Sequence, residues 1–130
     1  IFDYNKLGVS MLEDGLFAEK SWLKTHASTA EKFIRASIEG WKYAVAHPTY
    51  AGQVCFKDEG TNAETEAHQI YMAKQVASLV KYQLSGHPIG WLNPTAYKRT
   101  WQEAVTDGII AKAPSGATDM SYWSKASTGL

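Results

Sequence analysis

The chain has 130 residues, of which 45% are apolar and 20% are charged, a composition typical of one globular domain. Lys and Arg together number 13, as do Asp and Glu, so the formal net charge is zero. This balance argues against nucleic-acid binding, which needs clustered excess cation to displace counterions from phosphates. No apolar run approaches the roughly 20 residues that span a bilayer. The single cysteine, Cys55, excludes an internal disulfide framework and a cysteine-based zinc site.

The chain begins at Ile1 with no initiator Met and no signal-peptide pattern. We expect a processed or truncated chain, for which a missing signal says nothing about localisation. Residues 1–17 hold short apolar pieces separated by glycine and serine, a pattern that favours extended chain or a short strand. A short helix over Phe17–Lys24 fits this region as well.

A long amphipathic helix is predicted over residues 29–46. Ser28-Thr29-Ala30-Glu31 has the pattern of a capping box, which marks a helix N-terminus. We expect the apolar stripe behind it to pack in a core, with Gly40 permitting a close helix contact. The stripe consists of Phe33, Ile34, Ile38, Trp41 and Val45. Pro48 should end this helix and open a shorter one through Cys55, which we interpret as a small buried hydrophobe.

A second long helix is predicted over residues 62–84. A polar break at Lys57-Asp58-Glu59-Gly60 precedes it, and Thr61-Asn62-Ala63-Glu64 forms a second capping box. Gly86 is well placed to end this helix in the left-handed conformation.

A further helix is predicted over residues 94–107, with Asn93 as the N-cap and Pro94 at its first position. Residues 111–119 should form a loop, and Met120–Lys125 a last helical turn. The sum is rich in helix and poor in strand, which is natural for one part of a larger α/β protein.

Three stretches carry a family resemblance. Residues 3–17 read DYNKLGVSMLEDGLF, residues 30–44 read AEKFIRASIEGWKYA, and Ile89-Gly90-Trp91-Leu92-Asn93 is followed later by Gly108-Ile109-Ile110. In this order they resemble the returning strand, the helix ending in G-W-x-Y-A and the closing segment of the NMT1/THI5-like periplasmic binding proteins. That family includes the nitrate, sulfonate, taurine and pyrimidine-precursor binders of ABC transporters.

The resemblance implies an α/β parent with two lobes, of the type II periplasmic-binding-protein kind, of which this chain is the C-terminal portion. Residues 1–17 would be the crossing-strand region, and residues 18–130 the helices of lobe one and the C-terminal helix. The chain itself is then mostly helical, with one or two short strands near its N-terminus. Without the other lobe its apolar faces would be exposed, and we expect the isolated chain to self-associate or to swap segments.

Glu13 and Asp14 are the candidate ligand-binding residues, with Met11 and Leu12 beside them. In the resemblance this strand end lies between the lobes, where a carboxylate could accept hydrogen bonds from amino groups of a solute. Adjacent strand residues point to opposite faces, so at most one of the two carboxylates is expected to face the ligand. The other interpretation is a solvated turn carboxylate or a charge at a helix N-terminus.

The resemblance implies the solute-binding component of an ABC importer, periplasmic or otherwise extracytoplasmic, with a lipid anchor as an option in the full-length protein. Its partners would be the membrane permease and a small nitrogenous solute, such as a pyrimidine precursor of thiamine, held by hinge closure. An acidic cleft would repel nitrate or sulfonate. The residues offer no catalytic set and imply no cofactor. Among four scattered histidines, only His68 shares a helix face with an acidic residue, Glu64, which is too little for a metal site.

Two alternatives stay open. Thiamine-pyrimidine synthases of the THI5/NMT1 type share the architecture and use pyridoxal phosphate, but the residues for that role would come from the other half of the protein. The chain could equally be a stable helical fragment with no activity of its own. A secretory or lipoprotein signal in the upstream sequence would favour transport, and a cysteine-rich run would favour synthesis.

Overall fold

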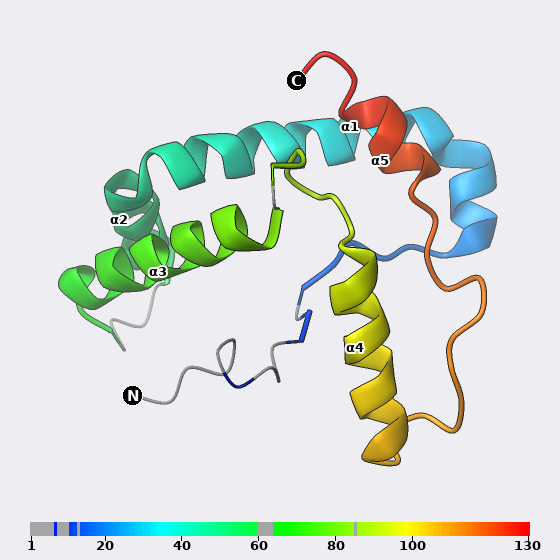
Figure 1. Cartoon of the computed structure of the whole chain (residues 1–130). Helices are drawn as coiled ribbons and strands as arrows, with labels where there is room; N and C mark the ends of the chain where they lie inside the picture. The colour runs from blue at the N-terminus through cyan, green and yellow to red at the C-terminus, as the bar shows by residue number, and fades with distance from the viewer. Residues whose placement is uncertain (1–6, 8–10, 13, 60–63, 85) are drawn as a thin grey trace.

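The computed structural model describes residues 7, 11–12, 14–59, 64–84 and 86–130. In this part of the chain all regular secondary structure is helical (Figure 1), which confirms the prediction of a mostly helical chain. The strand expected within residues 1–17 falls largely outside the described residues, and those described there form none. A strand is stable only when a neighbouring strand satisfies its backbone N–H and C=O groups, and the described residues offer no such neighbour.

The longest helix, α1, spans Lys20–Ala46 and is kinked at His26, where φ is −126° and ψ is 27°. The helix therefore begins well before the predicted capping box, and its break lies just ahead of that box. At the kink, His26 Nδ1 lies 3.0 Å from the Trp22 carbonyl oxygen and 2.8 Å from Thr25 Oγ1. The imidazole also stacks on the Trp22 indole, with ring centroids 4.7 Å apart. Side-chain contacts with the preceding turn thus accompany the bend.

Helix α2 (Pro48–Asp58) packs against α3 (Glu66–Leu84), and this is the most extensive helix–helix contact in the described part of the chain. Pro48 opens α2 as predicted, because a proline at the first position removes an N–H that has no partner there. The helix was expected to end near Cys55 but continues to Asp58, and Lys57 in its last turn is favourably placed near the negative end of the helix dipole.

Gly52 on α2 allows the close approach of α3. A Cβ atom at this position would lie 2.5 Å from Ile70 Cα and 2.7 Å from Ile70 N, which is far inside van der Waals contact. The predicted close helix contact at Gly40 is wrong. Gly40 is exposed, and a Cβ there would meet nothing within 4 Å.

Helix α3 begins at Glu66, later than the predicted residue 62, and ends at Leu84 as predicted. Thr65 Oγ1 accepts a hydrogen bond of 3.2 Å from the His68 backbone N–H, so Thr65 lies at the N-cap in place of the box predicted at residues 61–64. Residues 60–63 lie outside the described part. Gly86 has a φ of 85°, which confirms the predicted left-handed end.

Helices α4 (Pro94–Thr106) and α5 (Ser121–Ala126) lie close to their predicted ranges. Asn93 Oδ1 accepts hydrogen bonds from the backbone N–H groups of Thr95 (3.0 Å) and Ala96 (3.1 Å), which confirms the predicted N-cap. Figure 1 shows α4 standing apart from the rest, and no other described helix packs against it.

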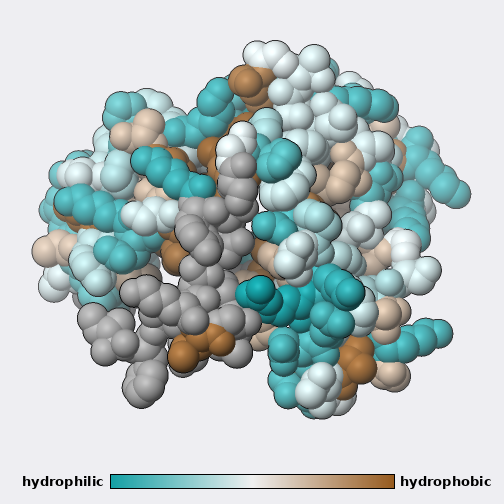
Figure 2. Space-filling model, in the orientation of Figure 1, coloured by the Kyte–Doolittle hydropathy of each residue, from teal (hydrophilic) through white to brown (hydrophobic). Residues whose placement is uncertain are grey.

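Little of the chain is buried. Helix α1 contacts α2 and α3 towards one end and α5 towards the other (Figure 1), without a second layer over its remaining faces. The buried apolar residues of the described part are Ala30, Ile38, Ala77 and Ala126. Of the stripe predicted to form a core, Ile38 is buried but Phe33 is 60% and Trp41 45% exposed. Apolar side chains, brown in Figure 2, accordingly reach the surface at several places between hydrophilic ones.

Candidate ligand site

The residues predicted to bind ligand lie on the segment before α1. Leu12 is half-buried, whereas Met11 and Asp14 are exposed. Glu13 lies outside the described residues. The Leu12 backbone N–H donates a hydrogen bond of 2.9 Å to Thr100 Oγ1, which fastens this segment to the middle of α4. The predicted ligand contacts of Glu13 and its neighbours stay predictions.

Thr100 was missed by the sequence analysis. Its hydroxyl donates to the Ala96 carbonyl oxygen at 2.9 Å and accepts from Leu12, so both hydrogen-bonding roles of the oxygen are used. The accepting role depends on a partner 88 positions away in the chain. No local pattern marks such a residue, because a threonine inside a helix ordinarily bonds only to its own preceding turn.

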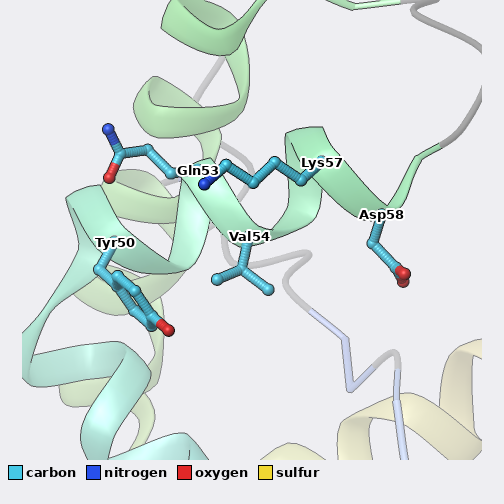
Figure 3. Close-up of a pocket in the computed structure, with 5 residues that line it drawn as sticks. All are labelled: Tyr50, Gln53, Val54, Lys57 and Asp58. Atoms are coloured by element: carbon cyan, nitrogen blue, oxygen red, sulfur yellow. The ribbon is translucent and has the colours of Figure 1, made fainter.

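One hollow of about 340 Å³ lies along α2 (Figure 3). Its lining comes from a single helix, at the three- and four-residue spacing of one helix face. Gln53 Nε2 at its edge donates to Glu66 Oε1 at 2.9 Å. Sites for small solutes enclose most of the ligand surface, which a single helix face does not do. The lining residues are Tyr50, Gln53, Val54, Lys57 and Asp58.

A second hollow of about 280 Å³, which we name the α1–α3 groove, lies where α1, α2 and α3 meet. Its lining is apolar except for Gln69, whose Nε2 donates to Glu59 Oε2 at 3.2 Å. Cys55 is exposed here, so the prediction that it is buried is wrong, because no described element covers this side of the helices. The lining residues are Trp41, Ala44, Val45, Ala51, Cys55, Gln69, Met72, Ala73, Val76 and Ala77. Of the predicted site residues, the three that the structure describes, Met11, Leu12 and Asp14, line neither hollow.

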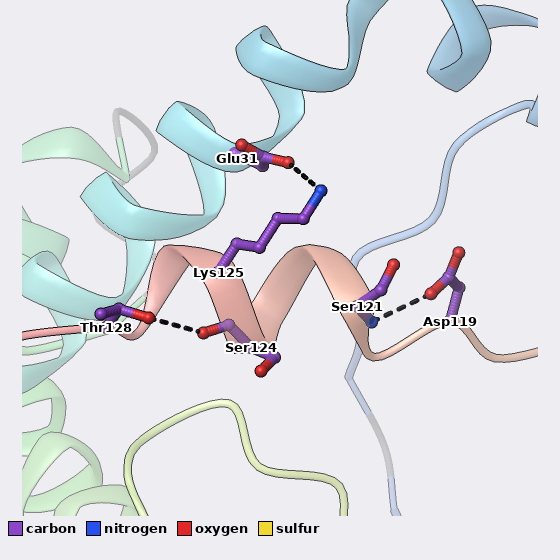
Figure 4. Close-up of polar contacts among 6 residues, drawn as sticks. All are labelled: Glu31, Asp119, Ser121, Ser124, Lys125 and Thr128. Atoms are coloured by element: carbon purple, nitrogen blue, oxygen red, sulfur yellow. Dashed lines mark hydrogen bonds and ion pairs between the residues drawn. The ribbon is translucent and has the colours of Figure 1, made fainter.

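The C-terminal segment is fastened to α1 by polar contacts (Figure 4). Lys125 Nζ lies 3.1 Å from Glu31 Oε1. Arg35 Nη1 donates to the carbonyl oxygens of Ala126 at 3.3 Å and Thr128 at 3.0 Å. These contacts therefore hold α5 and the residues after it against α1.

Hydrogen bonds to Ser121 surround the carboxyl group of Asp119 just before α5. Hydrogen bonds from the hydroxyl and then the backbone N–H of Ser121 lower the pKa of its carboxyl below the ordinary 3.8, and Lys125 adds a smaller effect in the same direction. The backbone bond measures 2.9 Å (Figure 4). Asp119 lies one residue before the N-cap, Met120, and its carboxylate accepts from the Ser121 N–H, which has no partner within the helix.

The histidines do not form a site in the described part of the chain. His68 Nε2 lies 3.7 Å from Glu64 Oε2, and both side chains are about half exposed, as in a solvated ion pair. His87 stacks on Trp91 with ring centroids 3.8 Å apart. No three His, Cys, Asp or Glu side chains among the described residues are grouped closely enough to hold a metal ion.

Similarity to known proteins is confined to the first part of the chain, which includes the segment before α1, α1 itself and the start of α2. Residues 1–51 match the NMT1/THI5 like family. This match supports the family named by the resemblance and contains its first two stretches, residues 3–17 and 30–44. It does not extend to the closing stretches near residues 90 and 109, and it does not place the NMT1/THI5 like segment in either half of a parent protein.

No curated protein and no solved structure shows a significant match to the chain. None of the described helices combines the length and the apolar character needed to cross a bilayer.

Proposed function

We propose that this chain is the C-terminal part of a two-lobed, extracytoplasmic solute-binding protein that delivers a small nitrogenous solute to an ABC importer. The observation that carries the proposal is the NMT1/THI5 like match over residues 1–51. The matched range holds the returning-strand sequence and the helix that ends in Gly40-Trp41-Lys42-Tyr43-Ala44, now seen as part of α1.

The two hollows favour a chain that is one part of a binding protein over a chain that encloses a solute by itself. The one along α2 is open and lined by a single helix, and the α1–α3 groove offers almost only apolar atoms. A polar solute needs several directed hydrogen bonds in a largely enclosed pocket. The proposal is therefore that the solute binds between this chain and a first lobe, and that closure of the two lobes desolvates the hydrogen bonds.

The family match is equally compatible with a thiamine-pyrimidine synthase. The two functions are separated by the reading frame upstream of the Ile1 codon and by the protein it encodes. A first lobe preceded by a secretory or lipoprotein signal supports transport. A first lobe with a cysteine-rich run, and a protein that purifies with lysine-bound pyridoxal phosphate, supports synthesis. An upstream frame that encodes no lobe at all refutes both.

The solute class is tested by isothermal titration of the longer protein with an aminopyrimidine precursor of thiamine, taurine and nitrate. We expect heat of binding with the aminopyrimidine, because the acidic pair at Glu13 and Asp14 disfavours anions. Binding of taurine or nitrate in its place would overturn the choice of solute and leave the transport function standing.

The site is tested by the matched variants Glu13→Gln and Asp14→Asn. A charge-assisted hydrogen bond contributes about 1.5–3 kcal/mol, so loss of the facing carboxylate should weaken binding by roughly tenfold or more. Only one of the two variants should show this loss, because neighbouring side chains of an extended segment point to opposite sides. Unchanged affinity in both variants would remove these carboxylates from the site.

A further inference from the structure

Helix α1 bends at His26 although the sequence there has none of the usual helix breakers. Sharp bends occur at proline, at glycine–serine pairs, at π-bulges, or where a side chain enters the backbone hydrogen-bond ladder. The described stretch Lys20–Glu39 contains no proline, glycine or π-bulge, which leaves the side-chain cause. In a regular helix the Trp22 carbonyl oxygen accepts from the backbone N–H of His26. Here two side-chain atoms reach that oxygen, His26 Nδ1 at 3.0 Å and Thr25 Oγ1 at 3.2 Å.

The bend fixes the position of the imidazole proton. A carbonyl oxygen only accepts, so Nδ1 of His26 must carry a proton when it lies 3.0 Å from the Trp22 oxygen. With a proton on Nε2 alone, two lone pairs would face each other at that distance. Thr25 Oγ1, 2.8 Å from Nδ1, accepts as well and donates its own proton to the Trp22 oxygen. The Trp22 indole stacks on the ring and holds its orientation. A straight helix needs no proton on Nδ1, so this form of the imidazole favours the bend.

The two sides of the bend differ in how firmly they are packed. The buried residues of α1, Ala30 and Ile38, both lie after His26. Before it, Trp22 is 40% exposed, and Phe17 on the preceding segment is 98% exposed. A turn about His26 therefore breaks few apolar contacts on its N-terminal side.

The chain before the bend is tied to α4. The Leu12 N–H donates to Thr100 Oγ1 at 2.9 Å, and among the described residues this is the hydrogen bond that joins α4 to a distant part of the chain. Figure 1 shows the segment running from the start of α1 to the side of α4, and no other described helix packs against α4. We name residues 11–12 and 14–25, together with α4, the N-terminal arm.

We propose that His26 is a hinge of α1 whose Nδ1–H form holds the helix bent, and that the N-terminal arm turns about it relative to the rest of α1. Hinges are a few residues that absorb a change in φ and ψ, and His26 is the residue of α1 with non-helical values. The arm carries Met11, Leu12 and Asp14, so the hinge sets where these side chains lie relative to the packed helices. The inference rests on α1 and α4 and not on the proposed function.

Nitrogen NMR of the histidine rings tests the proton position, at about pH 9, where imidazole is neutral. We expect the His26 ring to carry its proton on Nδ1 and to leave Nε2 bare. The ring is assigned by the loss of its signals in His26→Asn, which separates it from the other histidines. A proton on Nε2 in place of Nδ1 would overturn the proposal.

Distances between two spin labels test the bend itself. The labels sit on cysteines introduced at the exposed positions Ser21 and Ala36, in a Cys55→Ser background. A straight helix would separate the two backbone positions by about 22 Å, at about 1.5 Å per residue, and a bend shortens this distance. His26→Leu removes the donor and should lower the ratio of bent to straight helix by about three- to tenfold, the equivalent of one net hydrogen bond. His26→Asn is the matched variant, because its amide nitrogen can donate from near the position of Nδ1, and it should stay bent.

A label on the exposed Gln102 of α4 tests whether the arm moves as one. The distance from Ala36 to Gln102 should change in His26→Leu together with the distance across the bend. Labels at Ser28 and Lys42, which both lie after the bend, are the control pair and should keep their distance. Circular dichroism checks the helix content of each variant.

Three label results would also overturn the proposal. The first is a parent helix that is already straight across His26. The second is a distance across the bend that His26→Leu leaves unchanged. The third is a fixed distance from Ala36 to Gln102 while the distance across the bend lengthens. If His26→Leu fails to fold, the ring NMR of the parent chain still decides, because the proton position is measured without that variant.

Discussion

Replacing Gly52 by alanine tests the packing of α2 against α3. The new Cβ would lie 2.5 Å from Ile70 Cα, about 1 Å inside ordinary contact, and the obstructing atoms belong to backbone that cannot rotate away. Overpacking of this kind costs about 1–3 kcal/mol, and fixed backbone on both sides places it near the upper end. Alanine recovers about 1 kcal/mol of helix propensity, so we expect a net loss of about 2 kcal/mol. For a chain of this length that is a fall in Tm of about 7 °C.

The measurement is thermal and urea unfolding followed by far-ultraviolet circular dichroism at one protein concentration. Gly40→Ala is the matched control, since Gly40 also lies inside a helix and a Cβ there would meet nothing within 4 Å. We expect this control to gain about 1 kcal/mol, or about 4 °C. If Gly52→Ala stabilised the chain as Gly40→Ala does, α2 and α3 could not be packed as described.

Three further predictions concern side chains that accept hydrogen bonds from backbone N–H groups. Thr100→Val removes the acceptor for the Leu12 N–H, and amide exchange at Leu12 should speed up by about three- to tenfold, the equivalent of a typical net hydrogen bond. Asn93→Ala should cost about 1 kcal/mol and fray the start of α4, seen as a loss of helical NMR shifts there. Asp119 should titrate below 3.8 by NMR. Because its folded pKa is depressed, its support of α5 is present above 3.8 and is lost as the pH falls through the folded value, with the Ser121 amide as reporter.

The controls for these variants lie close by in the chain. Thr106→Val removes a hydroxyl that donates only to its own helix, at the Gln102 carbonyl oxygen, and should leave Leu12 exchange unchanged. Equal effects of the two threonine variants would contradict a specific link between Leu12 and α4. Helical shifts that survive Asn93→Ala would contradict the N-cap at Asn93. An Asp119 that titrates at or above 3.8 would contradict its hydrogen bonds from Ser121.

The helix ends that the sequence predicts well are those with strong local signals. Asn93 followed by proline, and Gly86 after the last apolar residue of α3, each fix the backbone within two or three residues. The capping-box patterns were less reliable. The N-cap of α3 is Thr65 and not the capping box predicted at residues 61–64. Any hydroxyl just before a helix can accept from the free N–H groups of its first turn.

Features that depend on distant residues could not be predicted in the same way. Nothing near Gly40 or Gly52 indicates which of them meets another helix, since the answer depends on the position of α3. The apolar stripe with Trp41 predicted a core, but Trp41 is largely exposed. A stripe shows that one face of a helix is apolar and does not show that another element covers that face. The candidate site at Met11–Asp14 was likewise placed by resemblance, and its contact with Thr100 follows only from the fold.

The contacts between α1 and α5 join residues 91 to 94 positions apart, whereas Gln53 and Glu66 in the α2–α3 pair are 13 apart. Loop-closure entropy grows with the logarithm of loop length, at about 4 kcal/mol for 90 residues against about 2 kcal/mol for 13. We therefore expect α2 and α3 to assemble early in folding and α5 to dock late. The exposed loop at residues 111–119 lies inside the long loop that the α1–α5 contacts close and outside the short loop that the α2–α3 contact closes. A protease cut there would release α5 from α1 and leave the α2–α3 pair folded.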